Sequence, residues 1–367
     1  MLIRQLLTKN LPFVVYRLQS EKEPVFLVQK SREVRQFSLR DLEQQKGFVI
    51  ASFDARKTRK AFILKPDITA RNEEERKKLS ASLSAFPDNV PLLPAENNLI
   101  ASKKVYLKQA NILISKIKSG KARKVVLSRV IEKLLPRNFD FDLFYSTFQQ
   151  CYPNAFVYLF YLPGKGIWAG ATPEMLLKRN GDFYETMALA GTQKRLLDDK
   201  PLHWEEKEKG EQAFVSDFVE EQIKKTGIKT YEIQPVETVF AGSLAHICTR
   251  FRFPASALSG KTGSFVIALH PTPAVCGLPK EKAWQLISET EKHRRYFYTG
   301  FLGPWQMENR TSLFVNLRCA RFLKDKIELY VGGGLTSASK PEKEWQETED
   351  KSATFLSVLE KMRNFAP

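Results

Sequence analysis

The sequence lacks the features that mark disulfide-rich, zinc-binding and membrane-spanning proteins. Its 367 residues include only four cysteines, which are scattered and form no C-x-x-C pair: Cys151, Cys248, Cys276 and Cys319. This spacing argues against a zinc site and against a disulfide framework. No apolar run approaches the roughly 20 residues of a membrane span, and residues 1–19 show no signal-peptide pattern. We therefore expect a cytoplasmic protein that has no contact with a membrane.

Acidic residues are in the minority. The chain has 58 Lys and Arg against 41 Asp and Glu, which gives a net charge of +17. Such a charge is relevant to partners and solubility rather than to the fold. Nucleic-acid binding, an anionic small substrate and a generally basic proteome are three interpretations. Because the basic residues are interleaved with acids and no nucleic-acid-binding motif is present, we expect no nucleic-acid partner.

The pattern of elements predicts an α+β fold with large antiparallel sheets. Short apolar runs alternate with charged turns in residues 1–98, and a Pro- and Asn-rich stretch at 86–98 is the best boundary candidate. Gly181 and Asp182 indicate a hairpin turn. Strands are expected at 124–134, 155–162, 166–179 and 182–195, and helices at 102–120, 204–227, 283–296 and 341–362. Few helices among many strands argue against a βαβ repeat.

Two of the expected helices carry paired carboxylates in line with their apolar faces. In the helix 204–227, Glu208 and Glu211 continue the buried stripe toward the N-terminus, and in the last helix Glu344 and Glu347 do the same, with Lys351 one turn later. If the two helices face each other, four carboxylates meet, and such a group needs a cation. Oxygen ligands favour a hard ion such as Mg²⁺. For either helix alone, the residues favour a solvated ion-pair ladder or an ordinary acidic first turn.

A series of motifs resembles the chorismate-utilising enzymes, the family of isochorismate, salicylate, anthranilate and aminodeoxychorismate synthases. The motifs follow the family's order: KVVLSR (124–129), GATPEMLLKR (170–179), LAGTQKR (189–195), EKEKGEQ (206–212), LAHICTRF (244–251), LHPTPAVCGLPKEKAW (269–284), YTGFLG (298–303), FVNLR (314–318) and GGGLTSASKPEKEWQETEDK (332–351). The resemblance implies a four-layer α/β/β/α fold with two large packed antiparallel sheets. Residues 99–367 form the expected chorismate-binding catalytic region. Residues 1–98 match the family's variable N-terminal portion, which we expect to pack into the same fold.

The resemblance also implies a Mg²⁺ site and anchors for the substrate. The family's metal carboxylates fall on Glu211 and Glu347, with Glu208 and Glu344 beside them, and this ion holds the ring carboxylate of chorismate. Lys351 is expected close to these acids. The enolpyruvyl carboxylate is assigned to Arg318 and Tyr298, because a guanidinium can bind both oxygens of a carboxylate. Glycines 332–334, with Gly333 at their centre, would allow backbone amides near an anion; a plain turn before the last helix is the alternative.

Two further positions carry the chemistry that the resemblance implies. Lys124 would be the general base that activates water, and Glu174 the general acid that protonates the departing 4-hydroxyl. We expect them to face each other across the ring pocket without forming a salt bridge. An acid near neutral pH needs a raised pKa, which the apolar neighbours 175–177 make plausible for Glu174. An exposed strand lysine and a strand-turn glutamate are the alternatives from the residues alone.

The remaining site residues bear on substrate contact and product. Thr192 is expected to line the ring pocket and His246 to bind or position substrate, although a lone histidine between apolar residues is more often part of the core. Cys276 departs mildly from the family pattern and is interpreted as a small buried thiol. Ala274 stands where family members that eliminate pyruvate or add ammonia tend to have Thr.

These residues favour a Mg²⁺-dependent isochorismate synthase that feeds menaquinone or siderophore biosynthesis. No glutaminase subunit is expected. Salicylate synthase is the first alternative, followed by aminodeoxychorismate synthase and anthranilate synthase component I. A basic nucleic-acid-binding protein that kept an enzyme fold is the alternative from another class, and its binding would depend steeply on salt.

Overall fold

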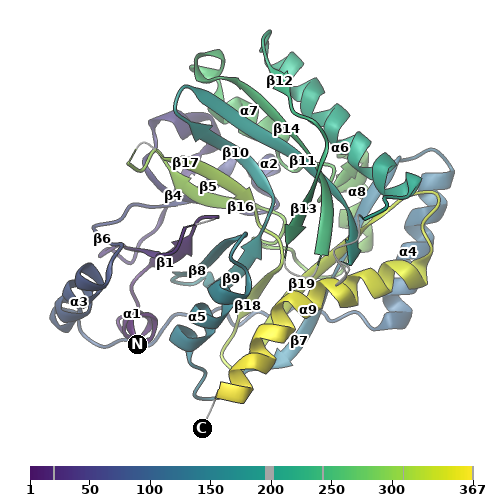
Figure 1. Ribbon diagram of the computed structural model, residues 1–367. Helices are drawn as coiled ribbons and strands as arrows, with labels where there is room; N and C mark the ends of the chain where they lie inside the picture. The colour runs from purple at the N-terminus through teal and green to yellow at the C-terminus, as the bar shows by residue number, and fades with distance from the viewer. Residues whose placement is uncertain (20, 195–201, 242–243, 309, 366–367) are drawn as a thin grey trace.

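Two large antiparallel sheets packed face to face form the body of the molecule (Figure 1). The computed structural model describes residues 1–365 except 20, 195–201, 242–243 and 309. The strand pairs of the described residues are antiparallel. This arrangement confirms the predicted α+β class with two large packed sheets.

The first sheet, here called sheet A, joins strands from both ends of the chain. Its order is β15 (Gly277–Leu278), β7 (Lys124–Leu134), β19 (Lys326–Leu335), β18 (Cys319–Phe322), β9 (Gly166–Thr172), β8 (Phe156–Leu162), β1 (Phe13–Arg17), β2 (Val25–Val28) and β6 (Ile68–Ala70). Most of these strands are buried along their length, because one face meets the second sheet and the other is covered by helices.

The second sheet, sheet B, is built in the same way. Its order is β12 (Glu232–Ile233), β14 (Leu244–Pro254), β11 (Phe183–Lys194), β10 (Met175–Asn180), β17 (Thr311–Val315), β16 (Phe301–Trp305), β4 (Gly47–Ala51), β5 (Lys60–Leu64) and β3 (Arg35–Ser38), with β13 (Glu237–Ala241) paired to β14. The predicted hairpin is present, since Asn180 pairs with Phe183 across Gly181 and Asp182. Residues 1–98 supply strands to both sheets.

Helices cover the outer face of each sheet and complete four layers (Figure 1). Apolar side chains of α1 (Leu2–Thr8), α5 (Phe141–Cys151) and α9 (Pro341–Phe365) pack on sheet A, and those of α6 (Glu206–Lys225) and α7 (Thr262–Leu269) pack on sheet B. A third cluster, rich in aromatic rings, fills the space between the sheets. The remaining helices are α2 (Ala55–Thr58), α3 (Glu73–Ser82), α4 (Lys103–Lys118) and α8 (Lys280–Thr290).

Two of the expected elements differ from the sequence prediction by more than a shift of a few residues at their ends. The expected single strand 166–179 is broken at Pro173 and Glu174, where the chain leaves β9 in sheet A and enters β10 in sheet B. The expected helix 283–296 is α8, which ends at Thr290 because Glu291 is extended and its buried carboxylate binds Arg295 and Ser128. In the described part of the chain, no helix combines the length and apolar character that crossing a membrane would require.

Candidate active site

A cavity between the two sheets brings together residues that are far apart in the sequence. It has an empty volume of about 790 Å³ including its open mouth. Its walls come from β7 and β19 of sheet A, from β11 and β14 of sheet B, and from the facing ends of α6 and α9. Most of the predicted site residues line it: Lys124, Glu174, Thr192, Glu211, His246, Ala274, Tyr298, Arg318, Gly333, Glu347 and Lys351.

Lys124 opens β7 and is only 2% exposed, so the alternative of an exposed strand lysine is wrong. Its Nζ lies 3.7 Å from the Oε2 atom of Glu211. Gly334 makes room for this side chain, because a Cβ at that position would lie 2.6 Å from the Cε atom of Lys124. The sequence therefore places a buried ammonium at the wall of the cavity, beside a carboxylate from α6.

Glu174 lies at the crossover between the sheets and is 3% exposed. Burial raises the pKa of its carboxyl to about 7, although the Thr272 hydroxyl and the Lys124 charge act in the opposite direction. The Thr272 hydroxyl donates to its Oε1 atom at 3.3 Å. The following residues 175–177 are buried, which agrees with the predicted apolar surroundings. Glu174 can therefore keep its proton close to neutral pH and give it to a bound molecule.

Arg318 reaches the cavity from the link between β17 and β18, with a φ of +48°. Such a left-handed backbone is uncommon outside glycine and often marks a functional position. The guanidinium contacts Nε2 of His246, whose Nδ1 lies 2.8 Å from the carbonyl of Gly191. Burial, followed by the Arg318 charge, lowers the pKa of His246 to about 3, so the ring is neutral. Neutral His246 donates through Nδ1 and accepts through Nε2, which holds Arg318 in place.

The glycines of β19 give space to side chains rather than forming a turn. They pair with β7 in a regular ladder, so the interpretation as a plain turn is wrong. A Cβ at Gly332 would lie 2.8 Å from the Tyr298 hydroxyl, and one at Gly333 would lie 3.3 Å from Glu344 Oε2. Tyr298 and the glutamates can approach the cavity wall only because these positions lack side chains.

Thr192 and Ala274 also line the cavity. The Thr192 hydroxyl lies 3.3 Å from Nδ1 of His246, so it belongs to the same group of contacts. Ala274 lines the cavity two residues after Thr272, in the segment that follows α7. Behind it Cys276 is buried, and burial raises the pKa of its thiol to about 11, as expected for an unreactive core cysteine.

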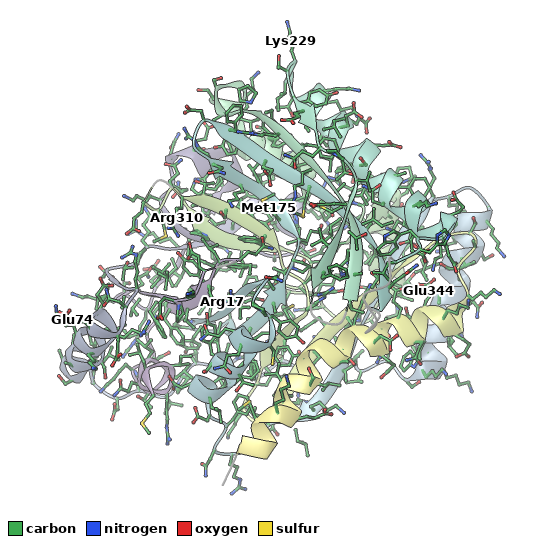
Figure 2. The ribbon with its side chains drawn as sticks, viewed as in Figure 1. Arg17, Glu74, Met175, Lys229, Arg310 and Glu344 are labelled. Atoms are coloured by element: carbon green, nitrogen blue, oxygen red, sulfur yellow. The ribbon has the colours of Figure 1, made fainter. Side chains whose placement is uncertain are left out.

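The acidic ends of α6 and α9 converge at one side of the molecule (Figures 1 and 2). Glu344, labelled in Figure 2, is only 1% exposed, so a solvated ladder is the wrong description of this residue. Burial, followed by the charge of Glu347, raises the pKa of Glu344. Burial raises the pKa of Glu347, but the Lys351 ammonium at 2.6 Å lowers it by more. The net pKa is therefore below its ordinary value.

Lys207 is a site residue that sequence reasoning missed. Its ammonium lies 3.0 Å from Glu344 Oε1 and 3.9 Å from Glu211 Oε1, so it links α9 to α6. The available signal was its position one turn before Glu211 on the same helix face. Thr272 was missed as well, since its contact with Glu174 joins segments 98 residues apart.

The carboxylates have the chemistry of a hard-cation site, although lysines stand among them. Within the described residues, no group of three or more acidic, His or Cys side chains is already arranged as a metal-ligand set. Two buried carboxylate oxygens, Oε2 of Glu208 and Oε2 of Glu344, make no hydrogen bond among the described atoms. Buried carboxylate oxygens without a partner are costly, and a divalent cation would satisfy them. The residues present therefore fit Mg²⁺.

Comparison with known proteins agrees with these motifs. The family model described as chorismate binding enzyme matches residues 34–360. Isochorismate synthase EntC of Escherichia coli (strain K12) is 28% identical over 243 residues, which are 64% of this chain and 62% of that protein. Isochorismate synthase MenF of Haemophilus influenzae is 27% identical over 286 residues, which are 76% of this chain and 65% of that protein. The chain thus spans less than two thirds of the length of each relative.

A solved structure shows the same fold. The menaquinone-specific isochorismate synthase MenF from Escherichia coli superposes with a TM-score of 0.76 at 21% sequence identity, over 95% of this chain and 88% of that one. The likeness extends over both sheets and their covering helices, since nearly the whole chain is matched. The four-layer architecture predicted from the motifs is confirmed.

Proposed function

The chain belongs to the family of chorismate-binding enzymes, and from this membership we propose that it converts chorismate reversibly to isochorismate. The relatives named isochorismate synthases support this choice within the family. The observation that carries the proposal is the placement of Lys124 and Glu174 on one cavity, both buried, with no ion pair between them in the described part of the chain. A chorismate-binding protein without catalytic activity would not need a buried acid and a buried base on one cavity.

The reaction exchanges one hydroxyl group for another. Water attacks C2 of the ring, the double bonds shift, and the 4-hydroxyl leaves as water, so that atoms balance and the product is an isomer. Lys124 is the residue that takes a proton from the attacking water. Glu174, as the neutral carboxyl, gives a proton to the departing hydroxyl, which would otherwise be a poor leaving group. Its pKa of about 7 leaves a large fraction protonated at neutral pH.

The two substrate carboxylates need separate anchors. Arg318, held by neutral His246, would bind the enolpyruvyl carboxylate together with Tyr298. Glu211 and Glu347 would hold Mg²⁺, with Glu208 and Glu344 beside them. When bound, the ion supplies the positive charge that attracts the ring carboxylate. Lys207 and Lys351 neutralise part of the acidic cluster and hold its carboxylates in position.

Ala274 favours a reaction that stops at isochorismate. Its methyl group offers no hydroxyl toward the ring, whereas family members that eliminate pyruvate or add ammonia tend to have Thr at this position. The product would then be released intact, as a supply for menaquinone or siderophore synthesis.

The test is incubation of the purified protein with chorismate and MgCl₂, followed by chromatographic separation of the products. We expect isochorismate, no pyruvate, and the same final mixture when the reaction begins from isochorismate. Protein carrying Glu174→Gln, purified in the same way, controls for a contaminating host enzyme. Salicylate with pyruvate, or an aminated product on addition of ammonium, would contradict the proposal.

A further inference from the structure

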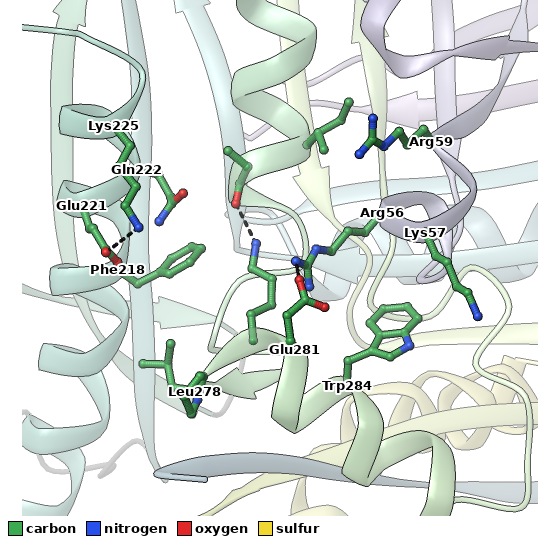
Figure 3. Close-up of a pocket in the computed structure, with 14 residues that line it drawn as sticks. Arg56, Lys57, Arg59, Phe218, Glu221, Gln222, Lys225, Leu278, Glu281 and Trp284 are labelled. Carbon is green, nitrogen blue, oxygen red and sulfur yellow. Dashed lines mark hydrogen bonds and ion pairs between the residues drawn. The ribbon is translucent and has the colours of Figure 1, made fainter. Parts of the chain in front are cut away.

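A second large pocket, here called the basic groove, lies between α2, α6 and α8 (Figure 3). Its empty volume is about 1470 Å³ including the open mouth. The groove is distinct from the catalytic cavity, and the two share no lining residue. They meet opposite ends of α6, since Glu211 near the start of this helix lines the cavity, whereas Phe218, Gln222 and Lys225 line the groove.

The charge of the groove favours an anion. Five cations and two carboxylates line it: Arg56, Lys57, Arg59, Lys225, Lys280, Glu221 and Glu281. Each carboxylate is already paired within the groove, Glu281 with Arg56 and Glu221 with Lys225. Among the described residues, Lys57 and Arg59 have no ion-pair partner, and Figure 3 shows both on the side that faces α6 across the groove. Their charges are therefore available to a bound molecule.

The floor of the groove is apolar and contains flat side chains. Trp284 is half-buried and stacks on Phe53, with ring centroids 4.2 Å apart and planes 12° apart. Phe218 faces the groove from α6, and Ile267 and Leu278 complete the apolar lining. A flat apolar body would cover these side chains while its charged end meets the cations. Inorganic phosphate would contact the cations but not the apolar floor of the groove.

The groove is joined to the catalytic cavity through Lys280. Its half-buried ammonium donates to the carbonyls of Ala268, Leu269 and His270 at 2.6, 3.5 and 3.3 Å, and so holds the end of α7. Lys280 also lines the groove. From His270 the chain runs directly to Thr272, which contacts Glu174, and to the cavity wall at Ala274. A ligand that moves Lys280 would therefore change the positions of Thr272 and Ala274.

We propose that the basic groove is a second ligand site, which takes an organic carboxylate with a flat aromatic body, and that its occupation alters turnover in the catalytic cavity. The carboxylate binds Lys57 and Arg59, and the ring lies against Trp284 and Phe218. The claim that the groove binds a ligand depends only on the lining of the groove. The claim that binding alters turnover rests on the proposed isochorismate synthase activity. Coupling passes through Lys280 and the segment 270–274.

The binding part is tested by calorimetry with 1-naphthoate, an aromatic carboxylate, in the absence of chorismate. The groove variant is Lys57→Gln with Arg59→Asn, because asparagine tolerates the left-handed backbone of Arg59, whose φ is +53°. The control variant, Lys104→Gln with Lys108→Gln, removes two exposed charges from α4, neither of which lines the groove. A third protein, Arg318→Gln, disables the anion site of the catalytic cavity.

We expect the groove variant to bind 1-naphthoate at least about tenfold more weakly than wild type, with the control and Arg318→Gln proteins unchanged. Neutral 1-naphthamide and inorganic phosphate should both bind much more weakly than 1-naphthoate. Equal affinity in the groove variant, loss of binding in Arg318→Gln, or equal binding of phosphate or the amide would overturn the site. None of these results depends on whether chorismate is a substrate.

The coupling part is tested by turnover at saturating chorismate, where competition in the catalytic cavity is suppressed. We expect 1-naphthoate to change kcat at least about twofold in wild type and in the control variant. The groove variant should keep its basal kcat and show no response. Binding without any change in kcat would overturn the coupling, and so would an equal response in the groove variant. If wild-type protein binds 1-naphthoate but does not convert chorismate, the proposed activity is wrong and the second ligand site is still supported.

Discussion

The Lys124 ammonium lies 3.7 Å from Glu211 and not against Glu174, although all three side chains line the same cavity. Glu174 instead accepts a hydrogen bond from Thr272, in a buried position that raises its pKa to about 7. An ion pair between the two would fix Glu174 as the carboxylate, which is the wrong protonation state for a general acid. Without such a pair Glu174 can keep its proton, as a general acid requires.

Replacing either group should remove catalysis without removing substrate binding. We expect Lys124→Ala and Glu174→Gln each to lower kcat by about 10²–10⁴, the usual contribution of general acid–base catalysis. KM for chorismate should change much less, because Arg318 and the carboxylate cluster remain. Lys133→Gln, at the exposed end of the same strand, is the control. Wild-type turnover in both catalytic variants would show that the assignment is wrong.

The buried carboxyl of Glu174 should make stability depend on pH in a defined direction. Its native pKa of about 7 lies above the ordinary value of 4.5, so between these values the native state binds more protons than the unfolded chain. The free energy of unfolding therefore falls as the pH rises from 4.5 to 7, by about 3 kcal/mol at most. Below pH 4.5 the stabilising contribution of Glu174 is fully present, and above pH 7 it is lost.

Glu174→Gln should remove this pH dependence. Urea unfolding at pH 5 and pH 8 is expected to show that the variant gains stability relative to wild type as the pH rises. Asp217→Asn, which changes an exposed carboxylate on α6, should show no such trend. A difference between Glu174→Gln and wild type that stays constant with pH would contradict the buried, protonated acid.

The carboxylate cluster should bind Mg²⁺ before substrate arrives. Glu211→Gln and Glu347→Gln are each expected to weaken Mg²⁺ binding at least about tenfold in calorimetry without chorismate, and to lower turnover in parallel. Removal of Mg²⁺ with EDTA should abolish the turnover of wild type. Glu206→Gln, in the same helix but bonded to Lys209, serves as the control. Equal Mg²⁺ affinity in all these proteins would show that Mg²⁺ does not bind at Glu211 and Glu347.

Ala274 should determine whether the reaction stops at isochorismate. We expect Ala274→Thr to begin to release pyruvate, measured with coupled lactate dehydrogenase, because its hydroxyl would reach the cavity wall beside Thr272. Ala274→Val has nearly the same shape without the hydroxyl, and it should release none. If the Thr variant also releases none, this position does not select the product.

Helix periodicity was the most informative part of the sequence. It placed Glu211 and Glu347 on the inner faces of two helices, because residues three or four apart share one side of a helix. Both carboxylates line the cavity, as that reasoning requires. Local turn chemistry was equally reliable at Gly181 and Asp182.

Contacts between distant segments could not be derived in this way. The pairing of Lys207 with Glu344 joins residues 137 positions apart, and nothing in either helix alone indicates it. The position of Glu174 depends on a change of sheet at Pro173, which a continuous run of strand-forming residues conceals. The early end of α8 depends on the buried pair of Glu291 and Arg295, again a tertiary effect.

The central claim is that water from the solvent attacks C2 while Glu174 protonates the departing 4-hydroxyl. The most direct test is conversion of chorismate in H₂¹⁸O, with the product analysed by mass spectrometry at early times. The account predicts isochorismate with one ¹⁸O atom, located in the C2 hydroxyl. Isochorismate without the label would show that the hydroxyl migrates within the molecule, and would contradict the roles given to Lys124 and Glu174.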